Sequence, residues 1–166
     1  MNKTIIIRGG GDLATGTISC LHQCGYQVLV LEITKPTAIR RSVAFSEAMY
    51  DGETEVEGIK ARKITQFSEA EVCWQDGIIP IICDEKAEAV KVVPHFAFVD
   101  AAIAKRNLGT TIDMADFVIG LGPGFTAGTD VDVVIETKRG HRLGRIIREG
   151  QAIANTGIPG IIGGYG

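Results

Sequence analysis

The sequence lacks the features of an exported, membrane-spanning or disulfide-stabilised protein. The apolar run at its start, MNKTIII, is too short for a signal peptide or a membrane span. Its cysteines, Cys20, Cys24, Cys73 and Cys83, form no CxxC pair. We therefore expect a cytoplasmic protein whose thiols are reduced and packed as small hydrophobic side chains. Cys20 and Cys24 would share one helix face, but no further ligands follow at zinc-like spacing, so metal or redox use of the pair is the weaker alternative.

The chain also lacks an excess of positive charge. Its 17 lysines and arginines against 20 acidic residues give a net charge of −3, which argues against a general nucleic-acid binder. No repeat recurs at a fixed period. The length of 166 residues predicts a single domain over 1–166, long enough to bury its own core.

What the sequence does have is glycine, 21 residues of it, and much of it is clustered. The first cluster lies in IIIRGGGDLATG, residues 5–16. Residues 4–8 read as a buried strand, Asp12 to about Cys24 as a helix ended by Gly25, and residues 27–32 as a second buried strand. This order predicts a parallel β-α-β unit, and with it an α/β fold of Rossmann-like type: a mostly parallel sheet flanked by helices, with added β segments.

The glycine loop matches the dinucleotide-binding pattern G-x-G-x-x-A at Gly9, Gly11 and Ala14. Gly9 permits the tight turn, Gly11 lets a pyrophosphate approach the backbone, and Ala14 lets helix and strand pack closely. The amides of residues 10–12, including Gly10, would hold the pyrophosphate at the helix N-terminus. The alternative is a glycine turn that serves tight packing only.

Two acidic residues complete the predicted site. Glu32 ends the second strand, 21 positions after Gly11, where an acid usually accepts hydrogen bonds from a ribose. It argues against a 2′-phosphate, although Lys35, Arg40 and Arg41 nearby could offset it. Asp12 would repel a phosphate, so we expect it to cap the helix with its carboxylate turned away from the ligand.

The middle of the chain is less regular. TEVEGIKARKI predicts a short hairpin or a bent strand about Gly58. SEAE predicts a capping box of Ser68 and Glu71 and a short helix to Trp74. Residues 78–83, IIPIIC, are a further apolar run, in which Pro80 weakens the case for a regular central strand.

A second glycine loop, VIGLGPGFTAGTD, follows an apolar strand at 117–121. Glycines here would line the same crevice, and threonine hydroxyls with backbone N–H groups could donate to phosphate. The alternative is a Gly-Pro turn with no ligand. The candidate ligand contacts in this loop are Gly120, Gly122, Gly124 and Thr126.

A further strand is predicted over 131–137, and the segment that follows it is basic. Residues 141–150 alternate basic and apolar side chains like a half-exposed strand. It is either a solvated sheet edge or a patch for an anionic ligand or partner. His141 has no supporting context as a catalytic base, and no nucleophile–His–acid order suggests hydrolase chemistry, so catalytic residues stay unassigned.

The chain contains the strings IIIRGGGDLATG, VLEITKPTAIRR, VAFSEAMYDG, VDAAIAKRNLGT, DMADFVIGLGPGFTAG, VDVVIETKRGH, LGRII and NTGIPG. Together they resemble the selenium-dependent molybdenum hydroxylase system proteins of the YqeB type, which are related to the XdhC/CoxI-like accessory proteins. The resemblance implies a Rossmann-like accessory protein that helps to mature a molybdenum hydroxylase by handling its molybdenum–pterin cofactor. The partner would be the hydroxylase apoenzyme. Members of this family continue beyond NTGIPG, so the chain is expected to be a truncated or short version.

The resemblance and the glycine pattern agree on a dinucleotide-type ligand, either a molybdenum–pterin dinucleotide or NAD. Two other functions stay open: an NAD-dependent oxidoreductase, and a non-enzymatic interaction module whose glycines are structural. Neither a membrane nor a nucleic-acid partner is expected, and a homo-oligomer is open.

Overall fold

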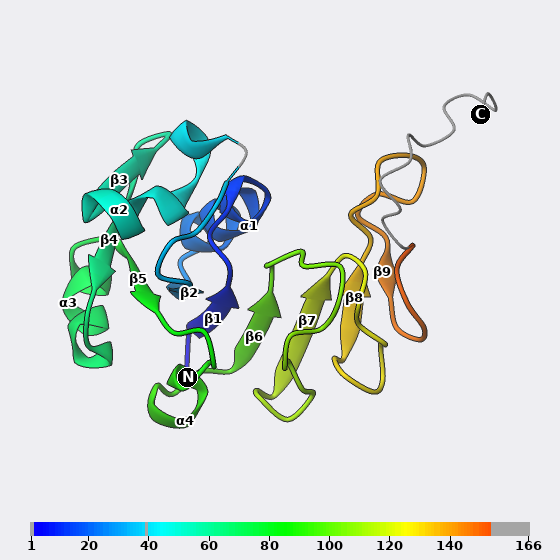
Figure 1. The fold of residues 1–166 in the computed structure, drawn as a ribbon. Coiled ribbons are helices and arrows are strands. Elements are labelled where there is room, and N and C mark those ends of the chain that lie inside the picture. Colours follow the sequence, from blue (N-terminus) through cyan, green and yellow to red (C-terminus); the bar gives the residue numbers. More distant parts are fainter. Residues whose placement is uncertain (1, 39, 154–166) are drawn as a thin grey trace.

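A computed structural model describes residues 2–38 and 40–153, which form one open nine-stranded sheet (Figure 1). The strand order is β3-β4-β5-β2-β1-β6-β7-β8-β9. All neighbours from β4 to β8 pair in parallel, and only the edge strands β3 and β9 pair antiparallel. The predicted α/β class, with added β segments, is therefore confirmed. The strands are β1 Thr4–Arg8, β2 Gln27–Glu32, β3 Glu53–Val56, β4 Ile59–Ile64, β5 Ile79–Cys83, β6 Ala97–Asp100, β7 Phe117–Leu121, β8 Val133–Ile135 and β9 Ile146–Ile147.

The helices gather around one half of this sheet. The longest is α1, Asp12–Gln23, and the others are short: α2 Ala48–Asp51, α3 Ala70–Gln75 and α4 Ala89–Val92, with 3-10 turns at Arg41–Val43, Phe45–Glu47 and Phe67–Glu69. In Figure 1 α1, α2 and α3 lie beside β1 to β5, whereas β6 to β9 are joined by loops. Within the described residues no helix is both long and apolar enough to cross a membrane.

The predicted β-α-β unit is confirmed at residue level. β1 and β2 run parallel, with Ile6 opposite Leu29, and both side chains are fully buried. α1 buries Ala14 and Ile18 against the sheet and ends before Gly25, whose φ is +92°. Burial of such apolar side chains is the main stabilising contribution here, at roughly 25 cal/mol per Å² of apolar surface.

The middle of the chain needs one correction. TEVEGIKARKI does form a hairpin, but the next helical turn is capped two residues earlier than predicted. Gln66 is its N-cap and Glu69 completes the capping box, whereas Ser68 and Glu71 do not form one. The Glu69 carboxylate accepts N–H bonds from Thr65 and Gln66, and these lower the pKa of its carboxyl group.

Pro80 is accommodated inside a central strand. It lies opposite Arg62 of β4, and the pairing of β5 with β2 begins only at the following residue, Ile81. The missing N–H therefore falls at the start of the strand, where proline is tolerated.

The crossovers explain the layers of the fold. The connections that leave β1 and β2 toward β4 pack on one face, through Ile18 of α1 and Phe45. The later parallel connections move in the opposite direction along the sheet and place Cys73, Ala89, Met114 and Phe125 on the other face. This is what right-handed parallel crossovers require.

Near the end of the described chain, regular structure is shorter than predicted. The strand predicted over 131–137 is reduced to β8, and the one predicted over 141–150 is reduced to the two residues of β9. Glycines at positive φ, Gly140 and Gly144, turn the chain instead, and Gly144 N–H donates to the carbonyl of Glu136. The glycine-rich tail NTGIPGIIGGYG, 155–166, lies outside the described residues.

The prediction of packed thiols is wrong for three of the four cysteines. Cys20, Cys24 and Cys83 are exposed, and only Cys73 is buried. Burial raises the pKa of the Cys73 thiol. Within the described residues no group of histidine, cysteine and acidic side chains could hold a metal ion.

Candidate functional site

The candidate site lies where the direction of the crossovers reverses. β1 sits between β2 and β6, and the chain leaves β1 toward one side and reaches β6 from the other. In open α/β sheets, ligands bind at the carboxyl ends of the strands at such a switch point. Three segments meet at this edge: residues 9–14 after β1, Glu32 at the end of β2, and residues 101–106 after β6.

The three consecutive glycines have three different environments. A Cβ on Gly9 would come within 2.9 Å of Ala102 Cα, and a Cβ on Gly10 within 3.2 Å of a Val30 methyl group. Both are therefore required by close packing. Gly11 is the N-cap of α1, and among the described residues no atom lies within 4 Å of its Cβ position. Only the backbone at Gly11 is open to an approaching group.

Glu32 binds the glycine loop itself. Its carboxylate accepts the Gly10 N–H at 2.7 Å and the N–H of Ile33 at 2.9 Å. The Gly10 amide is thus already engaged and is not available to a phosphate. Each carboxylate oxygen has a second lone pair, so Glu32 can still accept a ligand hydroxyl group.

Asp12 does not cap the helix, contrary to prediction. It is the first residue of α1, and no side chain makes a cap hydrogen bond at this end. Its carboxylate instead lies 3.6 Å from Nε of Arg40, whose side chain is exposed. This ion pair partly offsets the negative charge beside the helix N-terminus.

The helix N-terminus keeps its donors. Among the described residues, no acceptor is found for the backbone N–H groups of Asp12, Leu13 and Ala14. Such groups, together with the helix dipole, favour an anion. Ala14 is 1% exposed and packs in the core, which agrees with its predicted role in close helix–strand contact.

The second glycine loop is explained by packing. A Cβ on Gly120 would come within 2.6 Å of the Phe125 ring, and one on Gly122 within 2.8 Å of Thr137 Oγ1. Thr126 N–H donates to the carboxylate of Asp130, and its hydroxyl accepts from Gln151. These groups satisfy one another, so the arrangement matches a structural turn more closely than a phosphate cradle.

Segment 101–106 is held between the two glycine loops. Gly9 touches it at Ala102, and a Cβ on Gly124 would come within 2.7 Å of Arg106 Cα. Ile103 and Lys105 have φ values of +53° and +65°, which are unfavourable for a side chain and extreme for a β-branched one. The two loops thus fix a strained segment at the switch point.

A buried polar cluster at the end of β6 holds segment 101–106 in place. Asp100, 2% exposed, accepts the hydroxyl of Thr110 at 2.6 Å and the N–H of Ala102 at 3.1 Å. Nε of Arg8 lies 3.6 Å away and makes no hydrogen bond. The side-chain oxygen of Asn107 accepts the N–H groups of Gly109 and Thr110 within its own turn.

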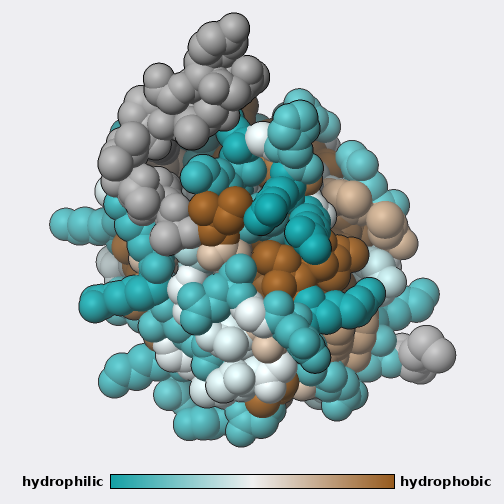
Figure 2. Space-filling model, turned by 90° about the vertical axis from the view of Figure 1, so that its right-hand side faces the viewer, coloured by the Kyte–Doolittle hydropathy of each residue, from teal (hydrophilic) through white to brown (hydrophobic). Residues whose placement is uncertain are grey.

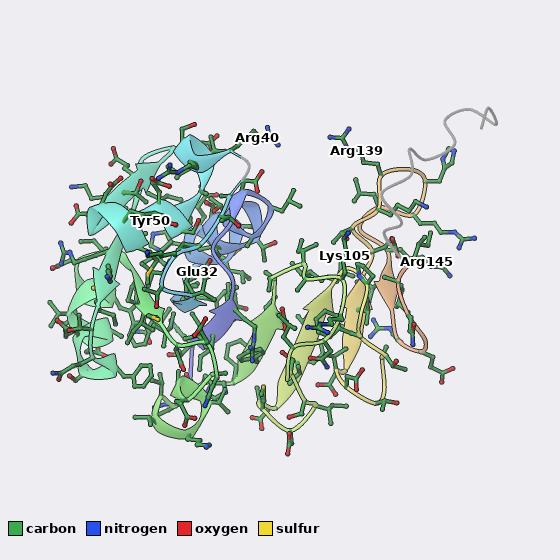
Figure 3. The ribbon with its side chains drawn as sticks, in the orientation of Figure 1. Glu32, Arg40, Tyr50, Lys105, Arg139 and Arg145 are labelled. Carbon is green, nitrogen blue, oxygen red and sulfur yellow. The ribbon has the colours of Figure 1, made fainter. Side chains whose placement is uncertain are left out.

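Basic side chains surround the edge. Lys105, Arg139 and Arg142 are exposed, and Figure 3 shows Arg40 and Arg139 at the same edge on opposite sides, one near α1 and one after β8. Arg41 is engaged elsewhere, in an ion pair with Glu47 at 2.6 Å and over the ring of Tyr50. His141 is exposed in the turn before β9.

Sequence reasoning missed that segment 101–106 is held between the two glycine loops. The sequence does carry one indication of this segment, because residues 101–116 show no helical periodicity. That absence predicts that the crossover after β6 is a loop.

Comparison with known proteins gives one informative similarity. The chain is 47% identical over 164 residues to "Uncharacterized protein YqeB" of Escherichia coli strain K12, covering 99% of the chain and 30% of that protein. No family model and no solved structure matches. The chain therefore has a YqeB homologue, and it spans less than a third of that relative's length.

Proposed function

We propose that the protein binds a dinucleotide-type ligand at the carboxyl edge of its sheet and serves as an accessory protein in the maturation of a selenium-dependent molybdenum hydroxylase. The observation that carries ligand binding is the open backbone at Gly11, beside the free N–H groups of α1 and within the switch point. The maturation role is supported by the family resemblance, which assigns no role to particular residues of this chain.

The residues fit one phosphate-bearing half of such a ligand. The N–H groups of Asp12 and Leu13 would hold a phosphate, Arg40 would offset the charge of Asp12, and Glu32 would accept a ribose hydroxyl. The ligand, as a molybdenum–pterin dinucleotide, would supply the metal-bearing group to the hydroxylase; as NAD, it would supply a hydride acceptor.

The second half of the ligand has fewer candidate contacts. The loop after β7 is internally satisfied, so Lys105 and Arg139 are the better candidates. An interaction module remains the second candidate function, because packing explains the glycines at 9, 10, 120, 122 and 124.

Substitution at the open glycine tests ligand binding. Gly11→Val places a side chain in unoccupied space at a φ of −67°, so the fold should persist while the ligand is excluded. The readout is native mass spectrometry after mixing with NAD and molybdenum–pterin cytosine dinucleotide in equal amounts. We expect wild type to retain one of them and Gly11→Val to lose it at least tenfold.

Gly16→Val is the matched control. Gly16 is exposed on α1 and also has nothing within 4 Å of its Cβ position. Its substitution should leave binding unchanged. Equal retention by the wild type and Gly11→Val would contradict the site, and retention of neither compound by the wild type would favour the interaction module. Retention of NAD alone would argue against the maturation role.

A further inference from the structure

One face of the sheet lacks cover over β6, β7 and β8, and we call it the open half-face. It is the side that α1 covers over β1 and β2. Because the crossovers from β6 to β7 and from β7 to β8 pack on the other face, no helix of the described chain covers it, although Ala97, Val99 and Leu121 at its floor are buried. Its apolar side chains are Ala97, Val99, Phe117, Ile119, Leu121 and Ile135.

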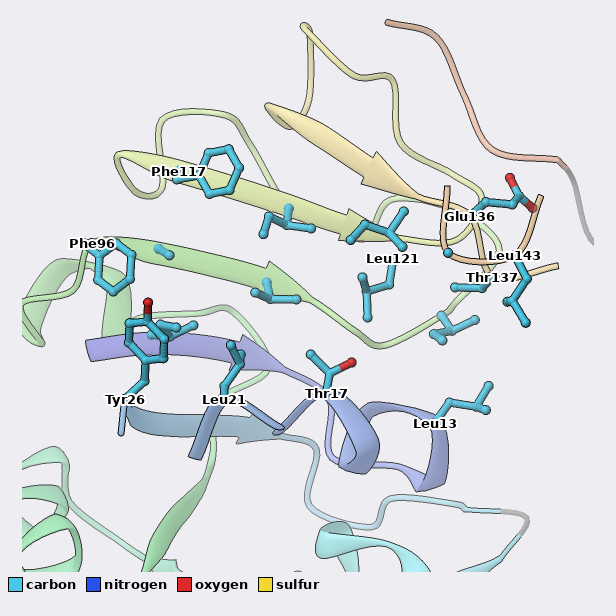
Figure 4. A pocket seen from close by; sticks show the side chains of 17 residues that line it. Leu13, Thr17, Leu21, Tyr26, Phe96, Phe117, Leu121, Glu136, Thr137 and Leu143 are labelled. Carbon is cyan, nitrogen blue, oxygen red and sulfur yellow. The ribbon is translucent and has the colours of Figure 1, made fainter. Parts of the chain in front are cut away.

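A groove of about 530 Å³ runs along the open half-face beside α1. Figure 4 shows Leu13, Thr17 and Leu21 of α1 on one side of it and Phe117 and Leu121 of β7 on the other. The lining is almost entirely apolar, yet Leu13 is 63% exposed and Phe117 41%. Exposed apolar surface of this extent on a parallel sheet marks an interaction site, since both faces of such sheets are normally buried.

The mouth of the groove at the carboxyl edge is basic. Ile103, Thr137 and Leu143 line it, and Lys105, Lys138 and Arg142 stand one or two positions from them. Arg40 pairs with Asp12, the residue that precedes Leu13 in α1. Figure 2, which looks onto the β9 side, shows apolar surface framed by hydrophilic side chains. An occupant with acidic groups at this end is favoured, and a second copy would oppose one basic mouth to another.

The dimensions fit a helix. β7 has five residues, a length of about 16 Å, which corresponds to about 11 residues of α-helix. α1, with 12 residues, already lies along the neighbouring strands in this layer. A second helix beside it would complete a layer of helices, the arrangement that buries a parallel sheet.

We propose that the open half-face is the seat of an amphipathic α-helix with acidic residues at the end near Lys105 and Arg142. We assign that helix to the additional chain that the Escherichia coli homologue carries outside the matched segment, which makes up only 30% of that protein. The inference does not depend on nucleotide binding, because the groove floor lies on the sheet face and the open amides lie at its edge.

Side-chain accessibility tests the proposal. In the Escherichia coli homologue, the residue aligned with Phe117 is replaced by cysteine in a background without other reactive cysteines. The substitution is made in two forms of that protein, the full-length chain and its matched segment alone. The measured quantity is the rate of labelling by an uncharged maleimide. The same Phe117→Cys change in residues 1–166 gives the reference rate for an uncovered groove. We expect labelling at least tenfold slower in the full-length homologue than in the segment.

The control is the residue aligned with Val72, which is 57% exposed on α3, on the opposite face. Its labelling rate should be equal in both forms. Cross-linking of the Phe117 position should identify a helical segment outside the match, and acid-to-lysine changes at its end should restore fast labelling. Equal rates at the Phe117 position would overturn the proposal. Protection that grows with protein concentration in residues 1–166 would also overturn it and assign the face to self-association.

Discussion

The two halves of the sheet are built from the same kind of parallel strand but differ in how their faces are covered. β1 to β5 have helices on both faces, contributed by α1, α2 and α3. β6 to β8 are joined by loops that cover one face only. The difference teaches that crossover direction, and not strand composition, decides which apolar surface a chain can bury by itself, because Phe117 and Ile119 stay partly exposed although they are as apolar as the buried Val28 and Val30.

The largest expected effect on the junction between the halves comes from a steric clash with segment 101–106. Gly124→Ala adds a methyl group within 2.7 Å of Arg106 Cα at a φ of +104°. We expect a loss of about 4 kcal/mol in the free energy of unfolding, from positive φ and overpacking together. Urea denaturation measures it. Gly128→Ala, at a φ of +87° with open space around it, should cost only about 1 kcal/mol. Equal losses would show that the close approach does not matter.

Removing the carboxylate below the segment tests the same junction from the other side. Asp100→Ala should cost about 3 kcal/mol, because it leaves the Arg8 side chain, which is only 11% exposed, without a charge partner and Thr110 without an acceptor. Thermal unfolding gives the measurement. The double variant Asp100→Ala with Arg8→Met should lose less than the two single losses combined. Strict additivity would mean that the two charges do not interact.

A matched pair of truncations compares the covered and the open face. Ile18→Ala in α1 removes a fully buried side chain and should cost about 2 to 3 kcal/mol. Phe117→Ala removes a larger side chain that is 41% exposed, and should cost less than about 1 kcal/mol. Chemical denaturation of both variants decides the point. A loss at Phe117 as large as that at Ile18 would mean that the open half-face is covered in solution.

Thiol labelling refines the description of the covered half without affecting stability. Iodoacetamide at pH 8 should modify Cys20, Cys24 and Cys83 and spare Cys73, whose thiol is buried and has a raised pKa. Mass spectrometry should find three added groups in the native protein and four after unfolding. Rapid modification of Cys73 in the native protein would show that α3 separates readily from β5.

The covered half was predictable from the sequence. Ile5 to Ile7 and Val28 to Leu31 are β-branched and apolar runs, and the glycine loop between them fixes a β-α-β unit through local signals. The bounds of β1, β2 and β7 agree with the prediction. The hairpin about Gly58 was also found, because its turn is encoded within four residues.

The capping box and the far end of the sheet were less predictable. Gln66 and Ser68 can each accept a backbone N–H, and only the path of the chain from β4 selects Gln66. The shortening of the strand predicted over 141–150 depends on the fold of Gly140 and Gly144, which alternation of side chains does not report.

The candidate site was partly predictable. The pattern located Gly9, Gly11 and Glu32. The contact that each residue makes depends on distances between segments, since Gly9 packs against Ala102 and Glu32 accepts the Gly10 N–H. The internal satisfaction of the second glycine loop likewise depends on Phe125, Thr137 and Asp130, which approach it through tertiary contacts.

The strand order has a consequence for fragments of the molecule. The boundary between β1 and β6 separates an N-terminal stretch, which holds five adjacent strands, from a C-terminal stretch, which holds the other four. A cut in the loop before β6 would therefore leave one piece with helices on both faces of its strands and another whose strands need a template. The first piece would fold alone, and the second would fold by adding β6 to the exposed edge of β1, so the two would reassemble as complementing fragments.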